Sequence, residues 1–166
     1  MAIKPTGEHE RLGRFEGSWA GTGHTHPSPW GPGSAATGSW VGRFDQSRLN
    51  LIVDYQEHRD DGSRFDAHGV MTVDPSDGQV LWFLFDSYGY PPLTPYRGTW
   101  SDMKLVLDKQ TPRGLGRTCY RLGDGQFVQE IESKVSDAPA FVAVSTMRFT
   151  RPYRSTRGLT QPKLLQ

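Results

Sequence analysis

Residues 16–27 decide the fold, and they read Glu16-Gly17-Ser18-Trp19-Ala20-Gly21-Thr22-Gly23-His24-Thr25-His26-Pro27. A large aromatic ring stands there among glycines. Glycine weakens a strand, so several in one strand mark bulges, bends or close approach of another backbone. Such a strand can curve sharply and open a small closed barrel. We therefore expect the Trp19 side chain to plug one end of the barrel interior.

The segment before this strand predicts one short helix over residues 8–15. Leu12 and Phe15 share a face at a spacing of three, and Thr6 stands where an N-cap residue is expected. We expect this helix to cover the end of the barrel.

The rest of the chain reads as runs of about six to twelve residues between turn signals, which is typical of an all-β barrel or sandwich. The turn signals include Asp60-Asp61-Gly62 and Gly123-Asp124-Gly125. The predicted strands lie near residues 18–26, 36–45, 49–58, 63–73, 79–86, 94–100, 104–110, 115–122, 126–135 and 141–151. Ten consecutive strands predict an antiparallel up-and-down barrel in one domain, residues 1–151, followed by an extended or disordered tail, residues 152–166.

Alternation within the strands predicts which side chains point inward. The expected inward sets are Leu49, Leu51, Val53 and Tyr55; Phe65, Ala67, Gly69, Met71 and Val73; Leu105 and Leu107; and Phe127, Gln129, Ile131 and Ser133. Residues 80–85 are apolar on both faces, which indicates that a helix or a second subunit covers the outside of that strand.

Composition excludes several classes of partner. The chain has 166 residues, and 19 Lys and Arg against 18 Asp and Glu give a formal charge of +1. That balance favours neither nucleic acid nor an anionic membrane. The single cysteine, Cys119, excludes an internal disulfide framework, and no stretch has the ~20 apolar residues of a spanning helix or the pattern of a secretory signal. We expect a soluble, cytoplasmic protein.

Several motifs, in their order along the chain, resemble the bacterial domain-of-unknown-function family 1579 (DUF1579). They are His9-Glu10-Arg11-Leu12, Gly17-Ser18-Trp19-Ala20-Gly21, Phe65-Asp66-Ala67-His68-Gly69, Val73-Asp74, Trp82-Phe83-Leu84-Phe85-Asp86-Ser87-Tyr88-Gly89, Gly98-Thr99-Trp100 and Met147-Arg148-Phe149-Thr150-Arg151. The resemblance covers roughly residues 8–151. It implies a calycin-like antiparallel barrel, related in architecture to lipocalins, fatty-acid-binding proteins and nitrobindins. It also implies that Trp19 packs near Arg148 or Arg151 of the last strand.

Two histidines were tested as metal or cofactor ligands. His24 and His26 share a face of their strand, but alternation puts that face opposite Trp19 unless a bulge at Gly21 or Gly23 changes the register. Two imidazoles without a nearby carboxylate or thiol fall short of a metal site, so no metal is expected. The opening motif is similar to that of nitrobindins, which hold haem through a late histidine. The chain has no histidine after His68, so no cofactor is expected.

A catalytic interpretation stays open beside a structural one. Asp54, Asp86 and His68 would form an acid–base pair if they converged in an apolar cavity, where burial raises the pKa of a carboxylate. In the structural interpretation, Asp86 caps the turn that follows it and Asp54 pairs with an arginine. Cys119 is expected to be a buried, inert thiol.

The function that the sequence favours is binding of a small hydrophobic molecule inside the barrel, because about ten strands leave room for a guest. Possible polar anchors are His68, Tyr120, Gln129 and Arg148. The complete set of predicted ligand-binding residues is Trp40, Tyr55, Phe65, His68, Trp82, Asp86, Tyr120, Gln129 and Arg148. Two alternatives remain: an isomerase or cyclase acting on an apolar substrate in the same cavity, and a homodimerisation module whose barrel is filled by its own side chains.

Overall fold

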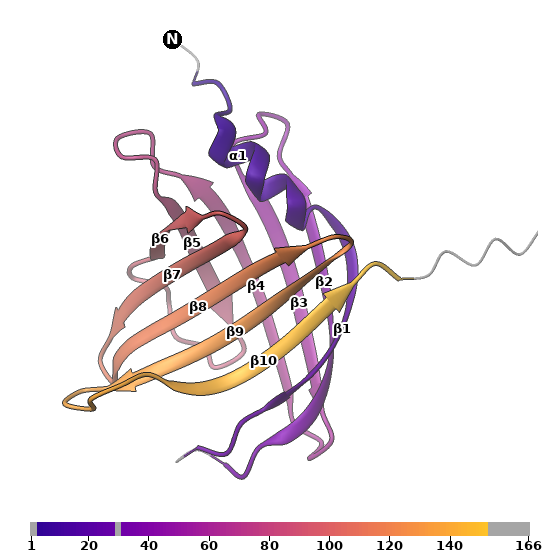
Figure 1. Ribbon diagram of the computed structural model, residues 1–166, viewed down its shortest axis with the longest axis vertical. Helices are drawn as coiled ribbons and strands as arrows, with labels where there is room; N and C mark the ends of the chain where they lie inside the picture. Colours follow the sequence, from indigo (N-terminus) through magenta and orange to yellow (C-terminus); the bar gives the residue numbers. More distant parts are fainter. Residues whose placement is uncertain (1–2, 29–30, 153–166) are drawn as a thin grey trace, which may run out of the picture.

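The computed structural model describes residues 3–28 and 31–152 and consists of one closed barrel of ten antiparallel strands (Figure 1). The strands follow one another around the barrel in chain order, and β1 closes it by pairing with β10. The predicted up-and-down barrel is confirmed. The elements are α1 Gly7–Leu12, the 3-10 turn η1 Gly13–Phe15, β1 Gly17–Thr25, β2 Ser34–Phe44, β3 Leu51–Arg59, β4 Arg64–Val73, β5 Val80–Asp86, β6 Tyr96–Ser101, β7 Lys104–Thr111, β8 Gly114–Gly123, β9 Gln126–Val135 and β10 Val142–Thr150.

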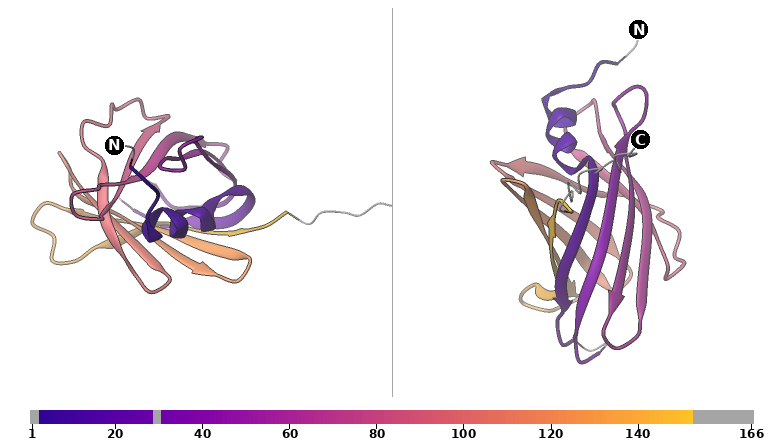
Figure 2. Two further views of the ribbon diagram at one scale, coloured as in Figure 1. Left: turned by 90° about the horizontal axis from the view of Figure 1, so that it is seen from above. Right: turned by 90° about the vertical axis from the view of Figure 1, so that its right-hand side faces the viewer.

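The N-terminal helix lies across one end of the barrel, which we call the closed end (Figures 1 and 2). Thr6 is its N-cap residue, as predicted, and the Thr6 backbone N–H donates to His9 Nδ1 at 3.0 Å. The helix is shorter than predicted because its last part tightens into η1. Phe15 ends that turn and enters the barrel, where its side chain is completely buried.

Two tryptophans of neighbouring strands hold the end of the helical segment. Trp19 of β1 and Trp40 of β2 are directly opposite each other, and both indole N–H groups donate to the carbonyl of Phe15, at 3.2 Å and 3.1 Å. The Trp19 side chain is buried at the closed end, as expected. On its other side the Arg151 guanidinium lies 3.7 Å from the ring centroid. Of the two arginines implied by the family resemblance, Arg151 is therefore the one that stacks on Trp19.

The glycines of β1 make room for large side chains of the last strand. A Cβ atom at Gly21 would lie 2.5 Å from the Phe149 ring, and one at Gly23 would collide with the backbone of Thr146. β1 and β10 pair directly along this stretch. The glycine-rich sequence therefore reports close approach rather than a bulge, so the register of β1 does not change between Trp19 and its end.

The outer face of β5 is apolar, as the sequence indicated. Leu81 and Phe83 are half-buried there, and Phe85 is 55% exposed. Helix α1 lies at the barrel end and does not cover this face (Figure 1). No helix in residues 3–28 and 31–152 is long and apolar enough to cross a membrane. The predicted tail after Pro152, together with Pro29 and Trp30 of the proline-rich loop, lies outside the described residues.

Candidate functional site

The half of the barrel under the helix is filled by aromatic side chains. Phe15 contacts the rings of Trp40, Tyr120 and Phe127, with centroid distances of 5.8, 5.1 and 5.2 Å. Trp40 is 1% exposed and also packs against Trp82. Trp40, Trp82 and Tyr120, predicted to line a ligand cavity, therefore fill the closed half. They form the floor of any site above them.

The opposite half of the barrel, which we call the open half, has smaller and more polar inward side chains. Phe65 and Tyr96 point inward there but remain partly exposed. The inward positions include Gly23, Ala36, Gly38, Ala67, Gly116, Thr118, Ile131, Ser133 and Ser145. Small side chains fill less of the interior, and partial exposure of inward rings means that solvent reaches them. The open half is therefore the candidate ligand site.

One wall of the candidate site is a polar surface formed by β8, β9 and β10. Thr118 and Ser145 are the direct neighbours of Ile131 on either side, and both are buried. Gln129 lies one inward position deeper than Ile131 and donates from Nε2 to Tyr120 Oη at 3.2 Å. Gln129 Oε1 and Ser133 Oγ are buried without a hydrogen-bond partner among the described residues. This wall therefore carries unused hydrogen-bonding capacity.

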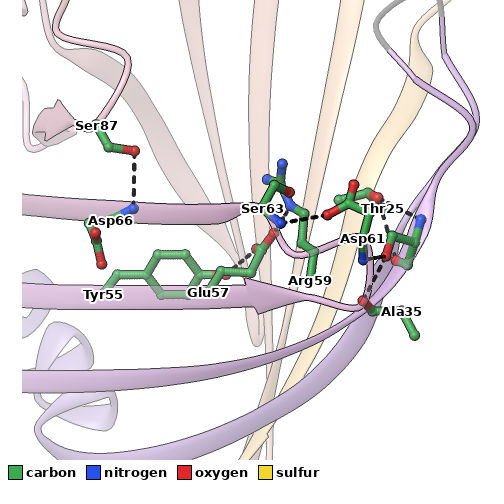
Figure 3. A network of polar contacts seen from close by, with 10 residues as sticks. Thr25, Ala35, Tyr55, Glu57, Arg59, Asp61, Ser63, Asp66 and Ser87 are labelled. Atoms are coloured by element: carbon green, nitrogen blue, oxygen red, sulfur yellow. Dashed lines mark hydrogen bonds and ion pairs between the residues drawn. The ribbon is translucent and has the colours of Figure 1, made fainter.

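The facing wall carries a buried ion pair on β3 (Figure 3). Glu57 is 2% exposed; its Oε2 accepts from the Tyr55 hydroxyl at 2.6 Å and its Oε1 accepts from Arg59 Nε at 2.6 Å. Burial raises the pKa of Tyr55 far above its usual range, and the Glu57 charge adds to the increase. Tyr55 therefore stays a neutral donor, and Glu57 is fully compensated.

The rim of the open half is formed by the loop after β5. Tyr88 packs on Phe65 with ring centroids 5.3 Å apart, and its side chain hydrogen bonds Arg59. Asp86 Oδ1 accepts from the Tyr88 backbone N–H at 3.0 Å, which confirms its structural role as a turn cap. Burial and the charge of Asp86 together raise the pKa of Tyr96, so Asp86 also faces the rim. On the neighbouring strand β7, Lys109 Nζ lies 5.4 Å from the Tyr96 ring centroid.

Two of the predicted polar anchors point away from the interior. His68 lies on the outer face of β4, where its Nδ1 is 2.6 Å from Asp54 Oδ1 and both side chains are more than half exposed. Arg148 lies on the outer face of β10 and donates to Gln126 at 2.7 Å. Asp86 is inward, so the Asp54, Asp86 and His68 set does not converge. The catalytic interpretation required these side chains to meet in the interior, but alternation puts His68 and Asp86 on opposite faces of neighbouring strands, so they form no interior acid–base pair.

The remaining candidates also lie outside the interior. The His24 and His26 rings contact each other, with centroids 4.4 Å apart, and His26 Nε2 lies 3.0 Å from Thr146 Oγ1 on the outer face. Within the described residues, no three His, Cys, Asp or Glu side chains are placed to hold a metal ion. Cys119 is a free, buried thiol, and burial raises its pKa, as expected for an inert group.

A hollow of about 520 Å³ opens on the outside of the closed end. It lies between α1 and the turn joining β6 to β7, and Arg11 covers one side of it, 5.7 Å from the centroid of the Trp100 ring. Acidic and basic side chains of α1 and η1 border it, including Glu8, Arg11 and Arg14. None of the residues that line it belongs to the polar wall of the open half.

Glu57 and Arg59 were not predicted as site residues from the sequence, although the alternation that places Tyr55 inward also places these two side chains inward. Both continue the inward set of β3 by two and four positions, but a charged side chain at an inward position contradicts the usual expectation for a core. Their inward orientation depends on pairing with each other and with Tyr55, which no single-strand pattern displays. Ser145 points inward by the same alternation as Met147 and Phe149 of β10, and the pairing with β9 shifts register only beyond it, between Ala143 and Ser145.

The fold and this interior define a calycin-like protein: a closed up-and-down barrel with a helix across one end and a polar wall at the other. The chain belongs to the family described as protein of unknown function (DUF1579), whose model matches residues 4–147. No curated protein sequence matches the chain.

Two solved structures have a similar fold. Rv2717c from M. tuberculosis superimposes with a TM-score of 0.68 at 16% identity, covering 89% of this chain and 99% of that one. The S-type phycobiliprotein lyase CPES from Guillardia theta gives a TM-score of 0.63 at 12% identity, covering 87% of this chain and 92% of that one. At such identities the likeness shows the fold alone.

Proposed function

We propose that the protein binds a small molecule in the open half of the barrel, between the polar wall of β8 to β10 and the Tyr55–Glu57–Arg59 wall. The ligand rests on the aromatic floor formed by Tyr120 and its neighbours. The observation that carries this proposal is the division of one interior into two halves. One half is filled with rings, while the other is lined by small, polar and partly exposed inward side chains.

The proposed ligand has an apolar body. Phe65 and Ile131 supply apolar surface on opposite sides of the opening, and small-molecule sites generally combine such surface with a few placed polar groups. Of the residues predicted from the sequence, the proposal retains Tyr55, Phe65, Asp86 and Gln129 as ligand neighbours. Thr118, Ser133 and Ser145 join them because they face the same space.

Native mass spectrometry of the full chain purified from its own host tests the proposal directly. A small molecule that co-purifies, and that leaves on denaturation, is the expected result. Titration with 2-naphthol, followed by calorimetry, provides a test with a defined probe.

The chain offers a matched pair of variants for the titration. Ala36 points inward at the open half and is buried, whereas Ala35 precedes it on the same strand and points outward. Ala36→Phe fills the site and is expected to weaken 2-naphthol binding at least ~10-fold, while Ala35→Phe leaves it unchanged. Equal binding by the two variants contradicts an interior site.

A second candidate function, self-association, is favoured by the outer face of β5 and the loop after it. Phe85 is exposed, as are Tyr88, Tyr90 and Leu93 of the loop that follows it, and groups of exposed apolar side chains are typical of interaction surfaces. A second copy covering this face gives a dimer with twofold symmetry. The solution mass of the wild type and of Phe85→Lys decides the matter: a dimer that the variant splits supports self-association, and a wild-type monomer excludes it.

A further inference from the structure

We infer that the ligand of the open half is an uncharged molecule that carries a hydroxyl or amide group, and that Gln129 is the residue that selects it. This inference rests on the proposed function, since it names the chemical class that the same site takes. It comes from Gln129, a deeply buried side chain of the site whose amide oxygen has no hydrogen-bond partner among the described residues.

The Gln129 amide is held in place by Tyr120 of the buried aromatic cluster. Its side chain is 7% exposed, and one end of the amide is engaged with Tyr120 Oη at 3.2 Å. Tyr120 is completely buried and also hydrogen bonds Trp82, so its hydroxyl cannot follow a moving partner. The other end of the amide, Oε1, is buried and unpartnered in the part of the chain that the structure describes. Native proteins pair the great majority of their buried polar atoms with protein groups, water or ligand, so this oxygen calls for a partner.

A hydroxyl or amide group of the ligand would supply the missing hydrogen-bond donor. Gln129 Oε1 accepts a hydrogen bond from an O–H or N–H group, and a ligand lacking such a group leaves the buried oxygen unpaired. Sites built around a buried polar group discriminate strongly against analogues without the matching group. Gln129 therefore acts as a specificity determinant and not only as part of the wall.

The charges around the site favour an uncharged ligand. Both oxygens of Glu57 are already bonded, to Tyr55 and Arg59, so this pair offers the interior no net charge. The other inward charges, Lys109 and Asp86, lie at the rim. A carboxylate beside Gln129 would face an oxygen acceptor and lose its hydration, which makes a buried anion unfavourable at that depth.

The pattern along β9 also gives the shape of the ligand. Gln129, Ile131 and Ser133 are successive inward residues, and two strand repeats place the first and last roughly 13 Å apart. Ile131 lies between the two unpartnered polar atoms. An apolar ring system against Ile131 therefore brings its polar group to Gln129, and Ser133 nearer the rim meets any second polar group.

Three probes of nearly equal size, which carry a hydroxyl, a methyl or a carboxylate group on the same ring system, test this ligand class in calorimetric titrations of the full chain. We expect 2-naphthol, which has a hydroxyl, to bind about 10-fold or more tightly than 2-methylnaphthalene, in which a methyl replaces it. We expect 2-naphthoate, which carries a carboxylate, to bind more weakly than 2-naphthol.

The variant Gln129→Leu removes the amide and is expected to abolish the preference for 2-naphthol over 2-methylnaphthalene. Gln56→Leu is the matched control, since Gln56 is exposed on the outer face of β3, and it keeps the full preference. A measurement that needs no variant follows the Gln129 side-chain amide by NMR. Its resonances shift with 2-naphthol more than with 2-methylnaphthalene.

The outcomes separate this inference from the proposed function. Equal binding of the hydroxyl and methyl probes, tightest binding of 2-naphthoate, or an unchanged preference in Gln129→Leu overturns the inference about the ligand class. In each case an interior site that Ala36→Phe blocks still stands. If none of the three probes binds and no molecule co-purifies, the proposed function fails and the inference fails with it.

Discussion

The shared acceptor at the end of the helical segment predicts a non-additive effect of two mutations. Trp19 and Trp40 both donate to the carbonyl of Phe15, and this carbonyl lies in the buried aromatic cluster. Replacing either tryptophan by phenylalanine keeps a ring in place but removes one donor. The carbonyl still has the other donor, so neither single variant leaves it unpaired.

The magnitudes follow from this geometry. Each of Trp19→Phe and Trp40→Phe is expected to lower the free energy of unfolding by about 2 kcal/mol, roughly half from the hydrogen bond and half from lost ring packing. The double variant also leaves a buried carbonyl without a donor, which costs about 1–2 kcal/mol more than the sum. Urea unfolding followed by far-ultraviolet circular dichroism measures all three. An osmolyte such as trimethylamine N-oxide raises the baseline stability if the double variant needs it.

A second cycle distinguishes the shared carbonyl from simple contact between rings. Trp40 and Trp82 pack with centroids 6.3 Å apart, but Trp82 bonds Tyr120 and not Phe15. The cycle of Trp40→Phe with Trp82→Phe is therefore expected to show a smaller coupling. If the Trp19 and Trp40 effects add to within about 0.5 kcal/mol, or if the two cycles couple equally, the shared carbonyl is not what joins the helix to the barrel.

Three further effects are expected. Gly98→Ala would place a Cβ atom against the backbone carbonyl of Val106 on the next strand, and we expect it to lower the free energy of unfolding by about 3 kcal/mol or more. Gly7→Ala is the control: its Cβ would meet open space, so the same urea experiment is expected to show no loss of stability or a small gain. Arg151→Ala removes the cation above the Trp19 ring and is expected to lower the free energy of unfolding by about 0.5–1 kcal/mol. Arg148→Ala, on the outer face of β10, is the control, and thermal melts are expected to show a smaller change for it. Hydrogen bonds from the serine two residues on and from a neighbouring arginine lower the pKa of Asp74 to about 2, so its stabilisation is complete above about pH 4 and is lost as the pH falls through 2. Urea midpoints of the wild type and Asp74→Asn therefore differ at neutral pH and converge near pH 2; a constant difference contradicts this.

Much of the fold could be predicted because the alternation of apolar and polar side chains is clear in strands such as β3 and β4. The inward positions of β4 from Phe65 to Val73 are those predicted, and the ten strand positions agree with the structure. Leu49 is the exception on β3: it lies in the preceding loop, where its backbone N–H donates to Asp45 Oδ1 at 3.2 Å. A side chain–backbone bond of that kind ends a strand without changing its hydrophobic pattern.

The location of the candidate site could not be predicted as well from the sequence. Alternation gives the direction in which a side chain points, but it does not show which other side chains fill the same part of the interior. Tyr120 and Phe65 both point inward, yet one is fully packed in the closed half and the other lies at the rim. The difference comes from Phe15, which reaches the interior from outside the barrel strands and fills one end only. His68 was proposed as an anchor for its chemistry although alternation placed it outside, and the structure follows the alternation.

The closed half also explains how the open half tolerates an incompletely bonded wall. A buried polar atom without a partner costs about 1–3 kcal/mol, which is a large share of the stability of one domain. The rings around Phe15 bury their apolar surface at the other end and make contacts that do not depend on a ligand. Because Tyr120 belongs to those rings and also accepts from Gln129 Nε2, the cluster positions the amide whose Oε1 has no partner among the described residues. Loosening the cluster is therefore expected to weaken ligand selection before it opens the barrel.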